Sequence, residues 1–242
     1  MRYNEKNVIR RHNSMKGKIK KIITVFLIAG IICESFSMTA SAGTSANVTT
    51  VFSDVYDDWY TESVQYVYDK GLMTGFKGTT LFRPEGNINK AQVAQVLYNM
   101  EGQPKVTDRK VFGALKDVYD YEWYADAVAW AYNTGVITGD LNTKKFYPKD
   151  NVTREQLALM MYRYADYKWY DIGATSNVSP YKYLDAHKIS NWTETAMNWA
   201  VEKQFIRGFQ TDLGFWKINP QGTATRREMA TILKRFCEYN GL

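Results

Sequence analysis

Cysteine and histidine are both scarce in this sequence, and their scarcity excludes several chemistries. One of the two cysteines, Cys33, falls in the N-terminal segment discussed below, so Cys237 is left as a single thiol that can form neither an internal disulfide nor a cysteine-based metal site. Of the two histidines only His187 lies beyond that segment, and one histidine without a Gly-x-Ser-x-Gly motif or a zinc-type partner gives no triad and no zinc centre. We predict no catalytic residue, no metal and no cofactor.

The chain also lacks an excess of basic charge outside its first 42 residues. That segment holds eight of the 31 Lys and Arg residues and two of the 25 Asp and Glu residues, which leaves 23 of each in the remainder. A nucleic-acid-binding protein needs a dense basic face to displace counterions from phosphate. We therefore exclude nucleic acid as a partner.

A long apolar run of the kind that spans a membrane is missing as well. Residues 22–32 form an apolar run of 11, preceded by four lysines in residues 16–21 and followed by the small residues Ala40-Ser41-Ala42. This order is typical of a secretory signal peptide, with an uncleaved anchor as the alternative. We expect residues 1–42 to be removed, leaving a secreted protein without a membrane span.

What the sequence does contain is a threefold repeat. Each unit has an aspartate, a tryptophan, a glycine, a proline and a basic residue in the same order: Asp54, Trp59, Gly75, Pro84 and Lys90; Asp117, Trp123, Gly139, Pro148 and Arg154; Asp185, Trp192, Gly208, Pro220 and Arg226. The Trp-to-Gly spacing is 16 in every unit and the Pro-to-basic spacing is 6. The Gly-to-Pro spacing is 9, 9 and 12, so the third unit carries an insertion of three residues.

These units and the polar stretches between them give the domain organisation. After the signal peptide and a short linker at 43–50, we place the repeats at 51–101, 111–165 and 182–242. Residues 102–110 and 166–181, rich in Gly, Ser, Pro, Asp and Lys, are predicted to be linkers. We interpret Cys237 as a small buried residue of the last helix, with an intermolecular disulfide as the alternative.

Within each unit the pattern predicts two helices joined by an extended arm. Apolar residues recur at helical spacing after each tryptophan, and a second helix begins after Asn89, Thr153 or Thr225, each followed three residues later by Gln or Glu in a capping box. Extended stretches are expected at 80–83, 145–147 and 215–219. One helix pair cannot bury both apolar faces alone, so the three units should pack around a shared core in a mainly α fold.

The basic residue at the start of each second helix is the candidate for ligand binding. A cation is disfavoured there because the N-terminal end of a helix is positive, yet Lys90, Arg154 and Arg226 occupy the position three times. A helix N-terminus with an arginine is a good anion site. We favour anion binding, the alternative being a surface ion pair with a neighbouring acid.

The other repeated residues have structural interpretations. We expect the aspartates to be turn or helix-capping residues, although a sugar hydroxyl could share the carboxylate. We expect the tryptophans to be core or groove-wall residues and favour packing over direct sugar stacking. The glycines, together with Gly71 and Gly135, fit turns that need positive φ, and three of them, Gly75, Gly139 and Gly208, also allow a ligand to approach the backbone closely.

These motifs resemble the S-layer homology (SLH) domain family over about residues 51–237. The resemblance implies a pseudo-three-fold prism of helix pairs that binds an anionic, commonly pyruvylated, secondary cell-wall polysaccharide in grooves between repeats and so attaches proteins to the bacterial cell wall. It maps the family's ligand contacts onto one set in each repeat: Asp54, Trp59, Gly75 and Lys90; Asp117, Trp123, Gly139 and Arg154; Asp185, Trp192, Gly208 and Arg226.

The repeats depart from the family pattern in different ways. The first has Lys90, which cannot make a bidentate fork, where the family has arginine, and the second has Gln156 for glutamate. The third has His187 and a longer Asp-to-Trp spacing of seven. We therefore predict that the second groove binds best.

Two other functions are weighed against this one. A wall hydrolase would need paired carboxylates in an apolar pocket, and no such pair stands out. An envelope protein that recruits another protein is the stronger alternative, because the repeats leave no room for a fused cargo domain.

Overall fold

The computed structural model describes residues 46–179 and 182–242, so the predicted signal peptide lies outside the described residues. The described part is mainly helical, as predicted. Its helices are α2 (Val48–Val51), α3 (Thr61–Asp69), α4 (Lys90–Met100), α5 (Val111–Ala114), α6 (Ala125–Asn133), α7 (Arg154–Tyr167), the 3-10 turn η1 (Ala186–Lys188), α8 (Glu194–Glu202) and α9 (Arg226–Asn240), with the strands β1 (Phe209–Gln210) and β2 (Trp216–Lys217). None of the described helices has the length and apolarity needed to cross a bilayer.

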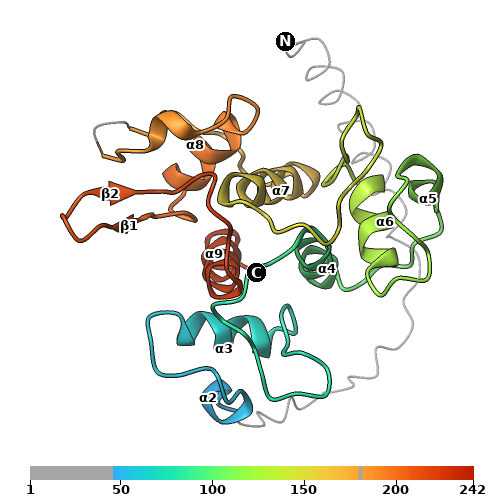
Figure 1. Cartoon of the computed structure of the whole chain (residues 1–242), viewed down its shortest axis with the longest axis horizontal. Coiled ribbons are helices and arrows are strands. Elements are labelled where there is room, and N and C mark those ends of the chain that lie inside the picture. The colour runs from blue at the N-terminus through green and yellow to red at the C-terminus, as the bar shows by residue number, and fades with distance from the viewer. Residues whose placement is uncertain (1–45, 180–181) are drawn as a thin grey trace, which may run out of the picture. The chain divides into compact units, whose positions relative to one another are not determined.

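The helices pair between repeats rather than within them. Helix α3 of the first repeat packs on α9 of the third, α6 packs on α4, and α8 packs on α7. Figure 1 shows α4, α7 and α9 in the middle with their partners outside them. Each first helix therefore buries its apolar face on the second helix of the preceding repeat, and the third repeat is followed by the first.

A triangle of backbone hydrogen bonds closes this cycle at its centre. The amide of Ile88 donates to the carbonyl of Ala224 at 3.0 Å, that of Ala224 to Val152 at 2.8 Å, and that of Val152 to Ile88 at 2.9 Å. All three residues are fully buried. Because each lies just before a second helix, the triangle fixes the starts of α4, α7 and α9 against one another.

Each second helix starts on a cap supplied by two repeats. The predicted capping boxes are present at Asn89, Thr153 and Thr225, where the cap side chain accepts the third amide of the helix. The first two amides, which have no partner inside a helix, donate to the following repeat's arm in every case: Lys90 to Asp150, Ala91 to Pro148, Arg154 to Gly222, Glu155 to Pro220, Arg226 to Gly86, and Arg227 to Pro84.

The three aspartates hold the arms rather than the helices. The Asp185 carboxylate accepts the amides of Ile218 at 3.0 Å and Asn219 at 2.8 Å, and the other two do the same in their own repeats: Asp54 with Phe82 and Arg83, and Asp117 with Phe146 and Tyr147. They lie in turns, as predicted, but the helix-capping interpretation is wrong. The second residue of each clamped pair has a left-handed backbone, with φ of 57° at Arg83, 57° at Tyr147 and 47° at Asn219, so the carboxylate stabilises a conformation that costs energy in L-residues.

We predict that Asp185→Ala lowers the free energy of unfolding by about 2–3 kcal/mol, because two amides beside a buried carboxylate lose a charged acceptor. Urea unfolding followed by circular dichroism measures the change. Asp212→Ala is the control, since Asp212 is an exposed aspartate of the β1–β2 hairpin and should change stability by less than about 0.5 kcal/mol. Equal losses in the two variants would contradict the role assigned to Asp185.

Candidate ligand grooves between repeats

Three grooves of similar size lie between the repeats, and we name each by its glycine. Each is lined by the turn and second helix of one repeat, the tryptophan of the following repeat and the basic residue of the preceding one. The Gly75 groove (about 460 Å³) contains Trp123 and Arg226, the Gly139 groove (about 510 Å³) contains Trp192 and Lys90, and the Gly208 groove (about 430 Å³) contains Trp59 and Arg154. The residue sets predicted from single repeats are therefore not brought together, and none of the three aspartates lines these grooves.

The tryptophans form an exposed wall of each groove. Trp59, Trp123 and Trp192 are 57, 61 and 58% exposed, so the favoured interpretation as packed residues is wrong, and they are groove-wall residues instead. The buried residue is the tyrosine that follows the tryptophan in the first two repeats, Tyr60 or Tyr124, and the indole lies edge-on against it. The guanidinium of Arg227 lies over the Trp59 ring, 5.3 Å from its centroid, and so occupies part of that indole surface. The remaining exposed indole surface is available to a ligand.

The basic residues mainly hold the arm of the following repeat, and we call each contact between a basic side chain and an arm carbonyl a clasp. Arg154 and Arg226 are 6% exposed, and their Nε atoms donate to the carbonyls of Ile218 and Phe82, each at 2.7 Å. Lys90 reaches the carbonyl of Phe146 less closely, at 3.3 Å. Since the helix-start amides are also bonded inside the protein, the backbone donors predicted to receive an anion are occupied.

The guanidinium groups have different second partners in the two arginine clasps. Arg226 donates from Nη2 to the carbonyl of Thr74 at 2.8 Å, whereas Arg154 forms an ion pair with Glu228. Burial lowers the pKa of Arg226 to about 10, while the charge of Asp54 opposes this shift. Among the described residues, Arg226 thus contacts two carbonyl oxygens and the rings of Phe76 and Phe82, and it forms no ion pair.

The glycines make room for the protein's own arm. A Cβ at Gly208 would lie 2.3 Å from the carbonyl oxygen of Lys217, and one at Gly75 would lie 2.9 Å from that of Leu81. Positive φ is found at Gly139 (68°) and Gly208 (74°), as predicted, but not at Gly75. At Gly208 and Gly75 the backbone of the arm approaches closely.

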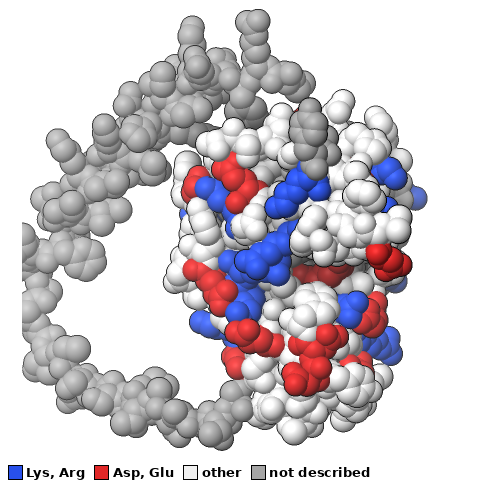
Figure 2. Space-filling view, turned by 90° about the vertical axis from the view of Figure 1, so that its left-hand side faces the viewer, with Lys and Arg blue, Asp and Glu red and all other residues white. Residues whose placement is uncertain are grey.

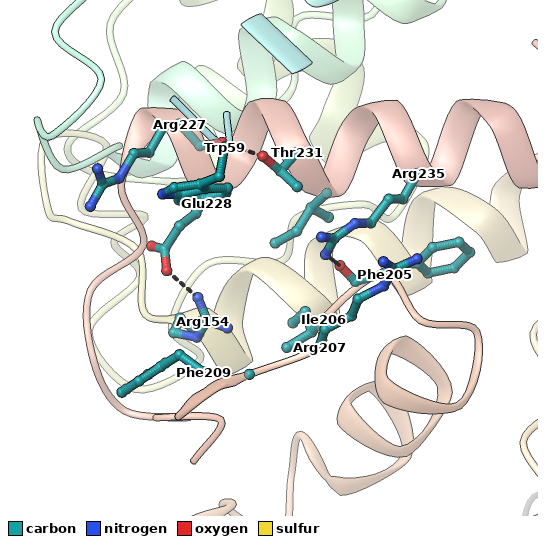
Figure 3. Close-up of a pocket in the computed structure, with 12 residues that line it drawn as sticks. Trp59, Arg154, Phe205, Ile206, Arg207, Phe209, Arg227, Glu228, Thr231 and Arg235 are labelled. Atoms are coloured by element: carbon teal, nitrogen blue, oxygen red, sulfur yellow. Dashed lines mark hydrogen bonds and ion pairs between the residues drawn. The ribbon is translucent and has the colours of Figure 1, made fainter. Parts of the chain in front are cut away.

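The Gly208 groove is the most basic of the three. Four arginines line it, Arg154, Arg207, Arg227 and Arg235, against one carboxylate, Glu228. Figure 3 shows Arg207 and Arg235 on one side of the groove, and Arg154, Glu228 and Trp59 on the other. Figure 2, which faces the side where the β1–β2 hairpin lies, shows basic side chains in a band with acidic ones beside it.

Two of these arginines have no carboxylate partner in the described part of the chain. Arg154 and Arg227 form ion pairs with Glu228 and Glu85, but Arg207 and Arg235 form none. Burial, together with the positive charges of Arg207 and Arg154, lowers the pKa of Arg235 to about 10. A cluster of like charges of this kind is stabilised by a bound anion.

The other two grooves are less basic. Lys90, Lys145 and Arg163 line the Gly139 groove together with Asp140 and Asp150, and the Gly75 groove has Lys77 and Arg226. The sequence-based ranking favoured the second groove because the first repeat has Lys90 for arginine and the third has His187 and a longer Asp-to-Trp spacing, and it assigned Arg154 to that second groove. The structure places Arg154 in the Gly208 groove instead, because each basic residue lines the groove of the next repeat.

Sequence reasoning missed Arg207 and Arg235. Alignment of the three repeats contains the signal for both. Arg207 stands where the other repeats have Thr74 and Thr138, and Arg235 follows Arg226 by nine residues, as Arg163 follows Arg154.

Over residues 46–179 and 182–242 no group of three or more His, Cys, Asp or Glu residues is arranged to hold a metal.

Comparison with known proteins agrees with the repeat pattern. The sequence profile of the S-layer homology domain matches residues 51–94, 114–158 and 182–230. The chain is 27% identical to an amylopullulanase of Thermoanaerobacterium thermosulfurigenes over 78% of its length and 10% of that protein. It is 26% identical to an S-layer protein of Bacillus thuringiensis subsp. finitimus (92% of this chain, 24% of that protein) and 23% identical to a cellulosome-anchoring protein of Acetivibrio thermocellus (71% and 36%). The chain thus spans a tenth to about a third of these relatives.

We predict that the clasps contribute unequally to stability. Arg226→Ala should lower the free energy of unfolding by about 2–3 kcal/mol, because two buried carbonyls lose a charged donor. Lys90→Ala, at the equivalent position, should cost less than about 1 kcal/mol because it removes one long contact at a half-buried site. Urea unfolding of the two variants tests this, and a loss for Lys90→Ala as large as that for Arg226→Ala would refute it.

Proposed function

The chain belongs to the S-layer homology domain family, and on this basis we propose that it attaches to the cell wall by binding an acidic polysaccharide in the grooves between its repeats. The family and the S-layer relatives indicate a protein of the cell surface or cell wall. We retain 51–101, 111–165 and 182–242 as the bounds of the three repeats.

The observation that carries the proposal is the pair of unneutralised arginines opposite an exposed tryptophan. In the Gly208 groove Arg207 and Arg235 lie across from Trp59. A guanidinium binds a carboxylate through two parallel hydrogen bonds, and an indole face packs against the C–H face of a saturated sugar ring. Both features suit one ligand, a sugar that carries an acidic substituent.

A pyruvate ketal is the substituent that we propose. It places one carboxylate beside a saturated ring, so one sugar residue could contact both the arginine pair and the tryptophan. In the other grooves, the counterparts of Trp59 and Arg154 are Trp123 with Arg226 and Trp192 with Lys90, while threonine stands in place of Arg207. In this proposal Asp54, Asp117, Asp185 and the three groove glycines shape the grooves without contacting the polymer.

Three modest sites on one chain strengthen attachment to a repeating polymer. Once one groove is occupied, the neighbouring grooves meet further polymer at a high effective concentration. Attachment can therefore be firm even if the Gly139 groove, where Asp140 and Asp150 oppose an anion, binds weakly.

The alternatives remain recruitment of a protein partner and wall hydrolysis. The matched enzymes do not favour hydrolysis, because the chain covers only 10% of the amylopullulanase and 16% of the exoglucanase XynX of Acetivibrio thermocellus, and three S-layer homology domains account for most of the aligned length. A test of binding to wall polymer distinguishes polysaccharide attachment from recruitment of a protein partner.

The test is co-sedimentation with purified wall sacculi, either native or stripped of secondary polymer by acid. We expect the protein to sediment with native sacculi and to stay in solution with stripped ones, without clearing either suspension. Equal binding to both preparations, or to neither, would rule out the polysaccharide and favour a protein partner. Clearing of the suspension would indicate a hydrolase.

We predict that Arg207→Gln weakens binding to native sacculi about tenfold, since it removes a charge-assisted contact without touching the buried clasps. Lys116→Gln is the charge-matched control, because Lys116 is exposed and lines none of the three grooves. Apparent dissociation constants from sedimentation at two salt concentrations measure the effect. An equal loss in both variants would mean that net charge, not the groove, determines binding.

A further inference from the structure

The third repeat has a hairpin that the other two repeats lack. The three-residue insertion lies between Gly208 and Pro220, and there β1 and β2 pair antiparallel, with Phe209 opposite Lys217 and Gln210 opposite Trp216. In the second repeat the same part of the chain closes with a single bridge between Asp140 and Lys145. The insertion therefore extends the chain at the edge of the Gly208 groove.

The register shows which face of the hairpin adjoins the groove. Residues opposite each other in an antiparallel pair point to the same side, and successive residues alternate. The amide of Thr211 donates to the carbonyl of Phe215 at 2.8 Å, which continues the pairing by one step. Phe209, Phe215 and Lys217 thus share one face, and Phe209 itself lines the Gly208 groove (Figure 3).

That face has two exposed rings and one unpaired cation. Phe209 is 44% exposed and Phe215 is 52% exposed. Lys217 forms no ion pair with any residue that the structure describes. Aromatic rings held in water on a short hairpin lose the stabilisation of burial, and such exposure marks a binding surface when the rings are grouped.

We propose that the hairpin is a further subsite for the same polysaccharide, so that the Gly208 groove binds a longer stretch of polymer than the other two grooves. At least one additional sugar residue lies across Phe209 and Phe215, with its acidic group toward Lys217. This inference rests on the proposed function. It commits to polysaccharide because the face repeats the chemistry of the adjoining groove, namely an aromatic surface beside a cation, and is continuous with it through Phe209.

The experiment compares polymer fragments of different length. Oligosaccharides released from purified sacculi by mild acid are separated by size, and their binding to the purified protein is measured by isothermal titration calorimetry. We expect Phe215→Ala to weaken binding of long fragments about threefold to tenfold and to leave the shortest binding fragment unaffected. Leu213→Ala, at the 82% exposed hairpin tip, is the matched control and should bind both like the wild type.

The outcomes separate the two proposals. If Arg207→Gln weakens fragments of every length while Phe215→Ala changes none, the groove binds polymer but the hairpin subsite is refuted. If Phe215→Ala weakens short and long fragments equally, the hairpin only shapes the groove, and the subsite is again refuted. If the wild type binds no fragment, both proposals fail together. A hairpin that serves a protein partner instead would give the first or the last of these results.

Discussion

The structure depends on the closed cycle in which each repeat completes the next. The buried triangle of Ile88, Val152 and Ala224 fixes the starts of the three central helices, and each start draws its first two amide acceptors from the arm of the following repeat. A single repeat does not contain the acceptors for these amides. Leaving the amides unpaired in the interior would be costly, so each repeat needs its neighbour. The arms are in turn held by aspartates and by the basic residues of the preceding repeat. Folding of the three repeats should therefore be cooperative.

This cycle also decides which side chains remain free for a ligand. The repeated motif positions are largely used for holding the chain together: Asp185 clamps an arm, Arg226 bonds two carbonyls and Gly208 admits a backbone. The groups that stay available lie at the edge of the motif or between motifs. They are the exposed indoles, of which Trp59 is one, and in the Gly208 groove the two arginines, Arg207 and Arg235, that form no ion pair with any described residue.

The grooves differ where the cycle does not constrain the sequence. Positions in the clasp and the cap vary little among the repeats, and each variation keeps a hydrogen bond, as when Gln156 replaces the glutamate of a capping box. By contrast, position 207 is arginine where the equivalents are Thr74 and Thr138, and the hairpin occurs in the third repeat alone. Three repeats of one architecture can thus present three different surfaces to one polymer.

Sequence alone determined the features that depend on near neighbours: three repeats, a capping box before each second helix, and glycine turns at Gly139 and Gly208. These follow from spacing and local hydrogen bonding, which act within a few residues. It could not determine which repeat's tryptophan faces which glycine, because helices pair with the preceding repeat and residues such as Trp59 and Arg154 meet across about a hundred positions. Nor could it show that Arg226 is buried while the indoles are exposed. Burial is a property of the assembled cycle, and only the tertiary structure decided it.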